Sequence, residues 1–243
     1  MTVTSEASDT RYRLPRGAVP TRYDLVIEPD LEAATFSGSE DIAVDVRESI
    51  EEIVLNAAEL DIDRGWLTGE DGRRVAVAEI RLDGSTERAH LGLSAALAPG
   101  PWTLHLEFRG VLNDRMAGFY RSTYVGQDGA EHVIATTQFE STDARRAFPC
   151  WDEPDLKAVF GVTLIVPGGL LAISNGPEVE RTEVDGGRVR VRFADTMPMS
   201  TYLAAFVVGP LEATEPVDVD GVPLRIVHVP GKGNLAAFAL EVG

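Results

Sequence analysis

Short runs in which apolar and polar residues alternate constrain the fold of this chain more than any other feature. Residues 23–29 place Tyr23, Leu25 and Ile27 on one face, and residues 42–46 repeat the pattern. A period of two is typical of a β-strand with one buried face. Stretches with a helical period are nearly absent before residue 234. The same reasoning predicts further strands at residues 52–56, 74–82, 102–109, 133–139, 160–166, 188–193, 202–208 and 224–229.

Turn sequences separate these runs at short intervals. They are Glu70-Asp71-Gly72, Asp83-Gly84, Pro99-Gly100-Pro101, Gln127-Asp128-Gly129, Pro167-Gly168-Gly169 and Asp185-Gly186-Gly187. Asp-Gly and Gly-Gly steps tolerate the positive φ that tight hairpins require. The last of these turns lies between two alternating runs and predicts a hairpin. Many short strands with this spacing predict an all-β fold, either a β-sandwich or large curved antiparallel sheets.

Composition limits the class of protein and its partners. The 243 residues are 44% hydrophobic and 25% charged, which is typical of a soluble globular protein. This length fits one large domain, or one domain and the beginning of another. The formal net charge of −17 would repel polyanions such as nucleic acid and anionic membrane surfaces. We therefore expect neither nucleic acid nor a membrane as a partner.

The cysteine content and the N-terminal sequence bear on the location of the protein. Cys150 is the single cysteine, so no internal disulfide can form and a reducing compartment is indicated. The N-terminal residues lack the basic and apolar regions of a signal peptide. No run approaches the roughly 18–20 apolar residues that are needed to cross a bilayer. These observations predict a cytoplasmic protein.

Residue patterns that support hydrolytic chemistry are missing from the sequence. A zinc hydrolase needs two histidines one helical turn apart, but no pair among His90, His105, His132 and His228 has that spacing. Neither a Gly-x-Ser-x-Gly motif nor a phosphate-binding loop occurs. Cys150 would need a histidine nearby to act as a nucleophile, and its aromatic and proline neighbours favour a buried packing role. We expect no catalytic group and no metal site from this chain alone.

Residues 136–154, here called the signature segment, begin as the end of a strand. The alternation of residues 133–140 places Phe139 on one face and both Gln138 and Glu140 on the other. Those two polar side chains either lie on a solvated face or serve a binding site. The aromatic and proline-rich sequence that follows is unlike that of a simple exposed hairpin.

The second half of the signature segment predicts a shaped loop. Pro149 and Pro154 restrict the residues before them to extended conformations. The charged residues are expected to hold the shape of the loop through exposed ion pairs worth about 0–1 kcal/mol each. They are Asp143, Arg145, Arg146, Asp152 and Glu153.

The signature segment is similar to the Thr-Gln-x-Glu…Ala-Arg…Phe-Pro-Cys-x-Asp-Glu-Pro signature of zinc aminopeptidases of the aminopeptidase N type. Residues 19–38 contain Val-Pro-x-x-Tyr-x-Leu-x-Ile-x-Pro-Asp-Leu followed by Phe-x-Gly, and they resemble the opening strands of these enzymes. Residues 199–209, Met-Ser-Thr-Tyr-Leu-x-x-Phe-x-x-Gly, resemble their closing core strand. The three motifs occur in the order of the family and span most of the chain.

The resemblance implies a saddle-like N-terminal β-domain and a role for two residues. In the family, the glutamate of Gln-x-Glu binds the free α-amino group of the substrate, and the glutamine lines the first specificity pocket. The corresponding positions are Glu140 and Gln138. The family uses zinc in a following catalytic domain, so zinc would belong to the full-length enzyme and not to this chain. The implied partners are that catalytic domain and peptide N-termini, and the chain alone is expected to be an inactive part of a peptide hydrolase.

The expected domain organisation has three parts. Residues 1–10 form a disordered lead-in, residues 11–212 the β-domain, and residues 213–243 a linker with the start of a truncated catalytic domain. In the last part, residues 234–243 have helical spacing of Leu235, Phe238 and Val242 after a possible cap at Asn234. Two other hypotheses stay open: a stand-alone, non-catalytic β-sandwich binding module, and an enzyme that depends on Cys150.

Overall fold

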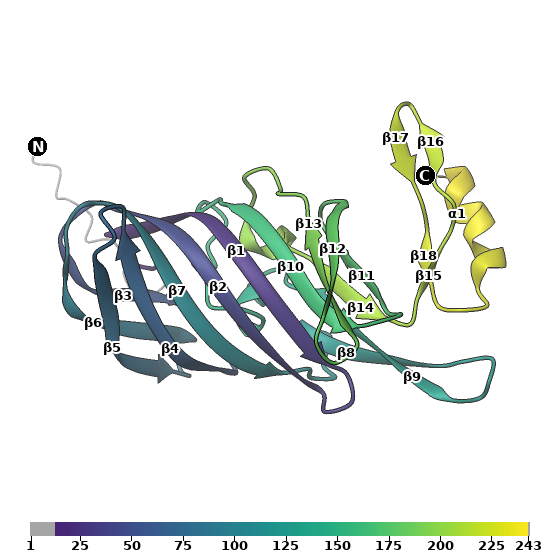
Figure 1. The fold of residues 1–243 in the computed structure, drawn as a ribbon, viewed down its shortest axis with the longest axis horizontal. Helices are drawn as coiled ribbons and strands as arrows, with labels where there is room; N and C mark the ends of the chain where they lie inside the picture. Colours follow the sequence, from purple (N-terminus) through teal and green to yellow (C-terminus); the bar gives the residue numbers. More distant parts are fainter. Residues whose placement is uncertain (1–12, 243) are drawn as a thin grey trace, which may run out of the picture.

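The computed structural model describes residues 13–242, so the predicted lead-in at residues 1–10 lies outside the described residues. Strands dominate this part of the chain, and the all-β prediction is confirmed (Figure 1). A long, twisted sheet carries ten strands. From edge to edge they are β12 (Glu178–Val184), β13 (Arg188–Phe193), β10 (Val159–Pro167), β1 (Ala18–Asp30), β2 (Thr35–Val46), β7 (Gly100–Val111), β4 (Leu60–Gly69), β5 (Arg74–Asp83), β6 (Arg88–Leu97) and β3 (Ile50–Asn56).

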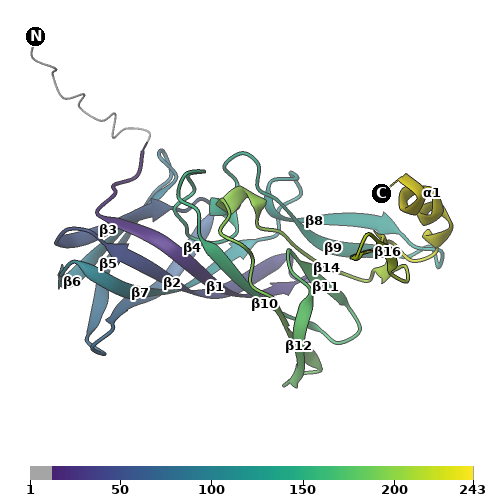
Figure 2. The ribbon, with the colours of Figure 1, turned by 90° about the horizontal axis from the view of Figure 1, so that it is seen from above.

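A four-stranded sheet lies beside the large one, and the loop of the signature segment joins the two (Figure 2). Its strands, in order, are β11 (Leu171–Ser174), β14 (Phe206–Gly209), β9 (Glu131–Gln138) and β8 (Gly118–Val125). Two short 3₁₀ turns, Ala144–Arg146 and Thr201–Leu203, flank this region. The strand predicted at residues 202–208 therefore begins only at Phe206, because the preceding residues form the second turn.

Neighbouring strands of the large sheet pair in antiparallel register, with one exception. The hairpin predicted at residues 184–189 joins β12 and β13 in antiparallel register, with Val184 opposite Arg188. In contrast, β1 pairs with β10 in parallel, although antiparallel sheets were expected. A parallel pair needs a crossover connection rather than a hairpin. Here the connection between β1 and β10 runs through β2 to β9 and the signature segment. No local turn sequence could therefore predict the parallel pair.

Aromatic side chains link the two sheets into one core. Tyr23 of β1 stacks on Phe160 of β10 with ring centroids 5.0 Å apart, and contacts Phe148 at 6.1 Å. Phe148 and Phe139 of the signature segment then lead to Phe206 of the small sheet, at 5.9 and 5.8 Å. All five rings are fully buried. The signature segment thus contributes side chains to the core and is not an exposed surface loop.

The C-terminal segment, residues 210–242, forms small separate elements. They are β15 (Glu212–Ala213), β16 (Val217–Val219), β17 (Val222–Leu224), β18 (Val227–His228), a 3₁₀ turn (Gly233–Leu235) and α1 (Ala236–Val242). The predicted terminal helix is present, but Asn234 lies inside the 3₁₀ turn and does not cap α1. The strand predicted at residues 224–229 is divided between β17 and β18.

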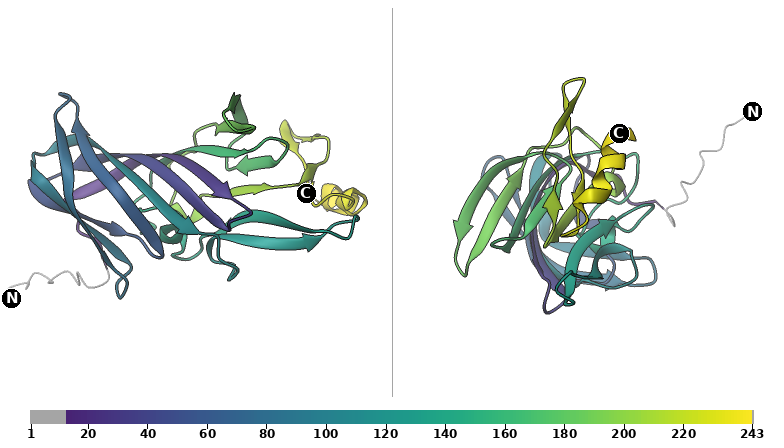
Figure 3. Two further views of the ribbon diagram at one scale, coloured as in Figure 1. Left: turned by 60° about the horizontal axis from the view of Figure 1, so that its bottom comes forward. Right: turned by 90° about the vertical axis from the view of Figure 1, so that its right-hand side faces the viewer.

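The C-terminal segment lies beside the outer end of the β8–β9 hairpin (Figure 3). The Tyr124 hydroxyl of β8 donates a hydrogen bond of 2.8 Å to the carbonyl of Pro210, where this segment begins. Within residues 13–242, no helix has the length and apolar character required to span a membrane.

Candidate substrate-binding site

Gln138 and Glu140 lie at the end of β9, where the strand gives way to the loop of the signature segment. Both side chains are exposed, whereas Phe139 between them is buried against Phe148 and Phe206. This is the arrangement that the alternation predicts, and the buried ring fixes the direction of its two neighbours. The peptide bond between Glu140 and Ser141 is cis.

A tight turn follows Glu140 and is closed by backbone hydrogen bonds. The amide of Asp143 donates to the carbonyl of Phe139 at 2.9 Å, and the amide of Arg146 donates to the carbonyl of Asp143 at 3.1 Å. The turn also packs on the first residue of β8. Gly118, which pairs with Gln138, has a φ of +70°, and a Cβ there would lie 2.6 Å from the Cβ of Arg146. Only glycine permits this close approach.

The adjacent arginines Arg145 and Arg146 both form ion pairs. Arg145 donates from Nε to Asp152 at 2.9 Å. Arg146 donates from Nε to Asp143 at 2.8 Å. Burial lowers the pKa of Arg146, but the hydrogen bond to Asp143 and the charges of Glu87 and Glu59 outweigh it, so the pKa is raised overall. Both guanidinium groups hold the loop through these ion pairs.

The acidic end of the signature segment is buried, which corrects the expectation of exposed ion pairs. The side chain of Asp152 is only 1% exposed, and it accepts hydrogen bonds from Arg145 and, at 2.6 Å, from the Thr201 hydroxyl. Glu153 is also buried and accepts from the Leu14 amide at 2.5 Å and from Arg16 at 2.5 Å. Removing one partner of a buried ion pair costs about 3–5 kcal/mol, well above the value of an exposed pair.

Comparison with known proteins identifies the family. Residues 19–203 match the Peptidase M1 N-terminal domain. The chain belongs to this family. It is 44% identical over 231 residues to aminopeptidase M1-D of Oryza sativa subsp. japonica, which covers 95% of this chain and 26% of that protein. It is 43% identical over 234 residues to aminopeptidase M1 of Arabidopsis thaliana, with the same coverage of 95% and 26%.

A human relative extends the comparison. Endoplasmic reticulum aminopeptidase 1 of Homo sapiens is 34% identical over 234 residues, which cover 95% of this chain and 25% of that protein. The chain thus spans about a quarter of the length of the curated relatives that it matches. The resemblance seen in the signature segment is confirmed at the level of the family.

The histidines of this M1 domain do not form a metal centre. Among the residues that the structure describes, none lies near another histidine-carboxylate cluster: His90 is near Glu52, His105 near Asp41 and Glu107, His132 near Asp128 and His228 near Glu212. Within the described part of the chain, no group of three or more His, Cys, Asp or Glu side chains could hold a metal ion. These residues do not fit a zinc site.

Cys150 lies in the core beneath the signature segment. Its backbone pairs with Asn56 through hydrogen bonds of 2.7 and 3.0 Å. Burial raises the pKa of its thiol well above the ordinary value, and the charge of Asp152 acts in the same direction. A protonated, buried thiol is a poor nucleophile, because the thiolate is the reactive form. The structure supports the packing role.

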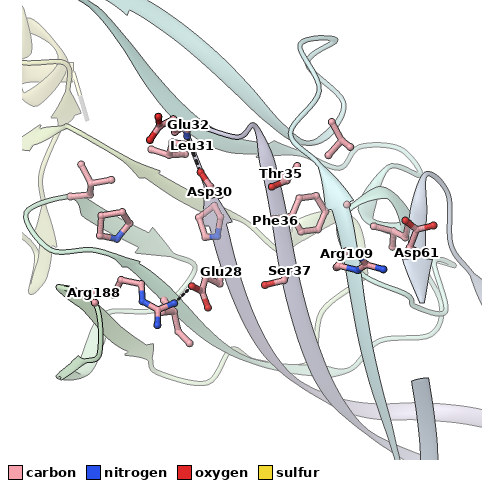
Figure 4. Close-up of a pocket in the computed structure, with 18 of the residues that line it drawn as sticks. Glu28, Asp30, Leu31, Glu32, Thr35, Phe36, Ser37, Asp61, Arg109 and Arg188 are labelled. Atoms are coloured by element: carbon pink, nitrogen blue, oxygen red, sulfur yellow. Dashed lines mark hydrogen bonds and ion pairs between the residues drawn. The ribbon is translucent and has the colours of Figure 1, made fainter. Parts of the chain in front are cut away.

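A separate hollow of about 1070 Å³ lies at the end of the large sheet and includes neither Gln138 nor Glu140 in its lining (Figure 4). Arg188 pairs with Glu28 in this hollow, and Asp30 accepts hydrogen bonds from the backbone amides of Glu32 and Ala33 at 3.1 and 2.9 Å. These charges are satisfied within the domain.

Two acidic residues that hold the signature segment were missed by the sequence reasoning. Glu59 and Glu87 accept hydrogen bonds from the Nη atoms of Arg146, each at 2.7 Å. Both lie far from the signature segment in the sequence, in connections between strands of the large sheet. No local pattern marks them, because their partners become neighbours only after the two sheets have packed together.

Proposed function

We propose that this domain supplies the amine anchor of an aminopeptidase, with Glu140 as the carboxylate that binds the free α-ammonium group of a peptide. The observation that carries this proposal is the placement of Glu140. It is an exposed carboxylate at the end of β9, and its direction is set by buried Phe139 and by the closed turn after it. A carboxylate and an ammonium form a charge-assisted hydrogen bond, which strengthens when water is excluded.

Gln138 takes the second role in this proposal, as part of the wall of the first specificity pocket. It is the last residue of β9, lies two residues before Glu140 and is exposed like it. An amide side chain can donate and accept hydrogen bonds there. The anchor enforces removal of N-terminal residues, because an internal peptide bond offers no ammonium group to pair with Glu140.

The catalytic part would be supplied by another region of a longer polypeptide. The relatives that carry this domain are named aminopeptidases and are about four times as long as the matched region. We assign zinc and its activated water to that region. Purified alone, this chain should not cleave an aminoacyl reporter, and measurable zinc-dependent cleavage would contradict this assignment.

The C-terminal segment is the proposed beginning of that catalytic region. The rest of the catalytic region is the proposed docking partner of this domain. Leu235, Phe238 and Val242 of this segment are exposed, with Phe238 at 71%. Exposed apolar side chains that cluster on one element commonly mark an interface. This feature favours a domain of a larger enzyme over a stand-alone β-sandwich binding module. A cytoplasmic location stays a prediction, supported by the buried, unpaired Cys150.

The test of the anchor compares two ligands in the full polypeptide that contains this domain. A dipeptide with a free α-amine is compared, as a competitive inhibitor, with the same dipeptide lacking that amine. Glu140→Gln should remove most of the preference for the free amine, a loss of ~2–5 kcal/mol if the pair is desolvated. Glu131→Gln, at the exposed start of the same strand, serves as the control. An unchanged preference in Glu140→Gln would show that another group binds the amine.

A further inference from the structure

Glu87 connects the large sheet to the loop of the signature segment through its side-chain carboxylate and its backbone carbonyl. Its carboxylate lies between the two arginines, accepting from Arg145 at 3.1 Å and from Arg146 at 2.7 Å. Its carbonyl accepts from the Ala57 amide at 3.0 Å and from the Asn56 side chain at 3.3 Å. One residue thus joins the end of β3, the start of β6 and the turn that follows Glu140.

Glu59 adds a second carboxylate to the same guanidinium group. It accepts from Arg146 at 2.7 Å and also pairs with Arg115. Arg146 therefore has three acidic partners, of which two, Glu59 and Glu87, come from the large sheet, while Asp143 belongs to the loop itself. The guanidinium group presents its donors in a rigid fork, so three carboxylates around it restrict both its position and its orientation.

The backbone at Glu59 and at Glu87 is in a conformation that glutamate rarely adopts. Their φ angles are +57° and +52°, in the left-handed region that favours glycine and asparagine. Such conformations persist where the surrounding structure over-determines them, and they concentrate at functional sites. Both of these unfavourable backbone positions direct a carboxylate to Arg146. This indicates that the contact with Arg146 has a role beyond the formation of the two turns.

The path from Arg146 to the end of β9 is short and consists of hydrogen bonds. Arg146 holds the side chain of Asp143 at 2.8 Å and donates its own amide to the Asp143 carbonyl at 3.1 Å. The Asp143 amide in turn donates to the carbonyl of Phe139, the residue before Glu140, at 2.9 Å. Displacement of Arg146 would therefore release the turn that sets the backbone of Glu140.

We propose that Glu87, assisted by Glu59, is a positioning residue for the amine anchor, acting through Arg146 and the turn of residues 140–146. This inference rests on the proposed function of Glu140. Glu87 does not touch the substrate. It keeps Glu140 in the geometry that favours an α-ammonium group, and the preference for a free amine therefore depends on a carboxylate of the large sheet.

The first experiment measures this dependence in the full polypeptide, with the same pair of dipeptide inhibitors. Glu87→Gln should lower the preference for the free amine about 10- to 100-fold, because small displacements of a binding group have effects of this size. Glu87→Asn is the second variant, since asparagine accepts the left-handed backbone but is too short to bridge the arginines. The matched control is Glu178→Gln, which removes a carboxylate of similar exposure, 39% against 33%, from its ion pair with Arg181 on β12.

The outcomes separate the inference from the function on which it rests. An unchanged preference in Glu140→Gln overturns the amine anchor itself. A preference that falls in Glu140→Gln but survives in both Glu87 variants overturns the positioning role alone. A uniform fall in affinity for both inhibitors in the Glu87 variants also overturns it, since that result indicates a general loss of structure. A selective fall in the free-amine preference, absent from Glu178→Gln, supports it.

The second experiment uses the present chain and needs no activity. Amide hydrogen exchange at Asp143 and Arg146 reports on the opening of the turn, because both amides donate within it. Exchange at these sites should become about tenfold faster in Glu87→Gln, while amides of β12 and β13 keep their rates. In Glu178→Gln the two turn amides should exchange as in the wild type. Unaltered exchange in both Glu87 variants would overturn the inference.

Discussion

The signature segment and the C-terminal segment use the same kinds of side chain in opposite ways. Phe148 in the former is 0% exposed, whereas Phe238 in the latter is 71% exposed. The charged groups Asp152 and Glu153 are buried with partners, but the C-terminal segment has a single buried hydrophobic residue, Ala236, in its last two turns. The first region is held from several sides, and the second is held by few contacts.

This difference separates what the domain needs for folding from what it offers to a partner. Burial of a phenylalanine removes a large apolar surface from water and stabilises the fold by about 1.5–3 kcal/mol relative to exposure. An exposed phenylalanine gives the isolated chain almost none of this. Residues of the signature segment therefore stabilise the two sheets, whereas the apolar side of α1 can contribute only when another surface covers it.

The largest expected effect is that of Phe148→Ala. Phe148 contacts Tyr23, Phe139 and Phe160, so its removal opens a cavity where the signature segment meets both sheets. The free energy of unfolding should fall by about 3–5 kcal/mol, as is usual for a buried phenylalanine. Because native domains have a stability of only about 5–15 kcal/mol, this variant should be close to unfolding at 37 °C. Urea unfolding, followed by circular dichroism, measures the change.

Phe148→Leu is the control, because it retains most of the apolar volume. Its loss of stability should be clearly smaller than that of the alanine variant. Equal losses would mean that the aromatic ring itself, and not the filling of the space, holds the signature segment. A loss below about 1 kcal/mol in Phe148→Ala would contradict the view that this segment supports the core.

A second test concerns a buried acid beneath the signature segment. Glu40 of β2 is 1% exposed, and neither carboxylate oxygen has a hydrogen-bond partner. Burial raises the pKa of Glu40 well above its ordinary value, and the neighbouring charge of Asp41 acts in the same direction. The titratable groups that face it are Tyr23 of β1 and Cys150 of the signature segment, both also with pKa values raised by burial. Burial therefore favours the neutral form of Glu40 in the folded protein.

Replacement of Glu40 should have an effect that depends on pH. The folded state keeps the proton, while the unfolded state loses it as the pH passes the ordinary pKa of glutamate. Stability of the wild type therefore falls with rising pH until the folded pKa is reached. Glu40→Leu removes this penalty, so its advantage in unfolding free energy should grow by about 1.4 kcal/mol per pH unit within that window. Urea unfolding from about pH 5 to about pH 8 measures the slope.

Glu183→Leu on the exposed edge strand β12 is the control for this slope. Since Glu183 is exposed, its replacement should shift stability by a small amount that does not vary with pH. A pH-independent difference for Glu40→Leu would mean that Glu40 is charged in the folded state. The core below the signature segment would then contain water or a partner that compensates the charge.

The parts of the fold that the sequence predicted are those governed by local alternation. Residues 23–29 and 42–46 alternate cleanly and became β1 and β2. By contrast, β4 was missed because a register shift between Ile62 and Arg64 interrupts its period of two. The strand β6 was missed because small residues weaken its pattern, as at Gly92 and Ser94. The parallel pair of β1 and β10 depends on contacts between distant parts of the chain, which no local pattern encodes.

In the candidate site, too, some features follow from local alternation and others depend on tertiary contacts. The period of a strand predicts a common face for Gln138 and Glu140, and both side chains are exposed, although β9 ends at Gln138 and Glu140 lies in the following turn. The roles of Glu59 and Glu87 do not follow from any pattern, because positive φ at a glutamate contradicts its local preference. Tertiary contacts overrule the local preference at these two residues. The alternation therefore predicts that Gln138 and Glu140 are exposed, the proposed anchor role comes from the family resemblance, and no pattern indicates the residues that hold the turn.

The smallest expected effect returns to the C-terminal segment. Phe238→Ala in the present chain should change the free energy of unfolding by less than about 0.5 kcal/mol, because surface substitutions usually stay within this range. The side chain already lies in water, so its loss opens no cavity. In a longer polypeptide that contains a docked catalytic region, the same substitution should be destabilising, as for a buried phenylalanine.

Parallel thermal unfolding of the two polypeptides measures the contrast, with Val125→Ala at the exposed end of β8 as the control. A large loss in the short chain would mean that α1 already packs on the β-domain, and an equal, small loss in both polypeptides would mean that its apolar side is not the docking surface.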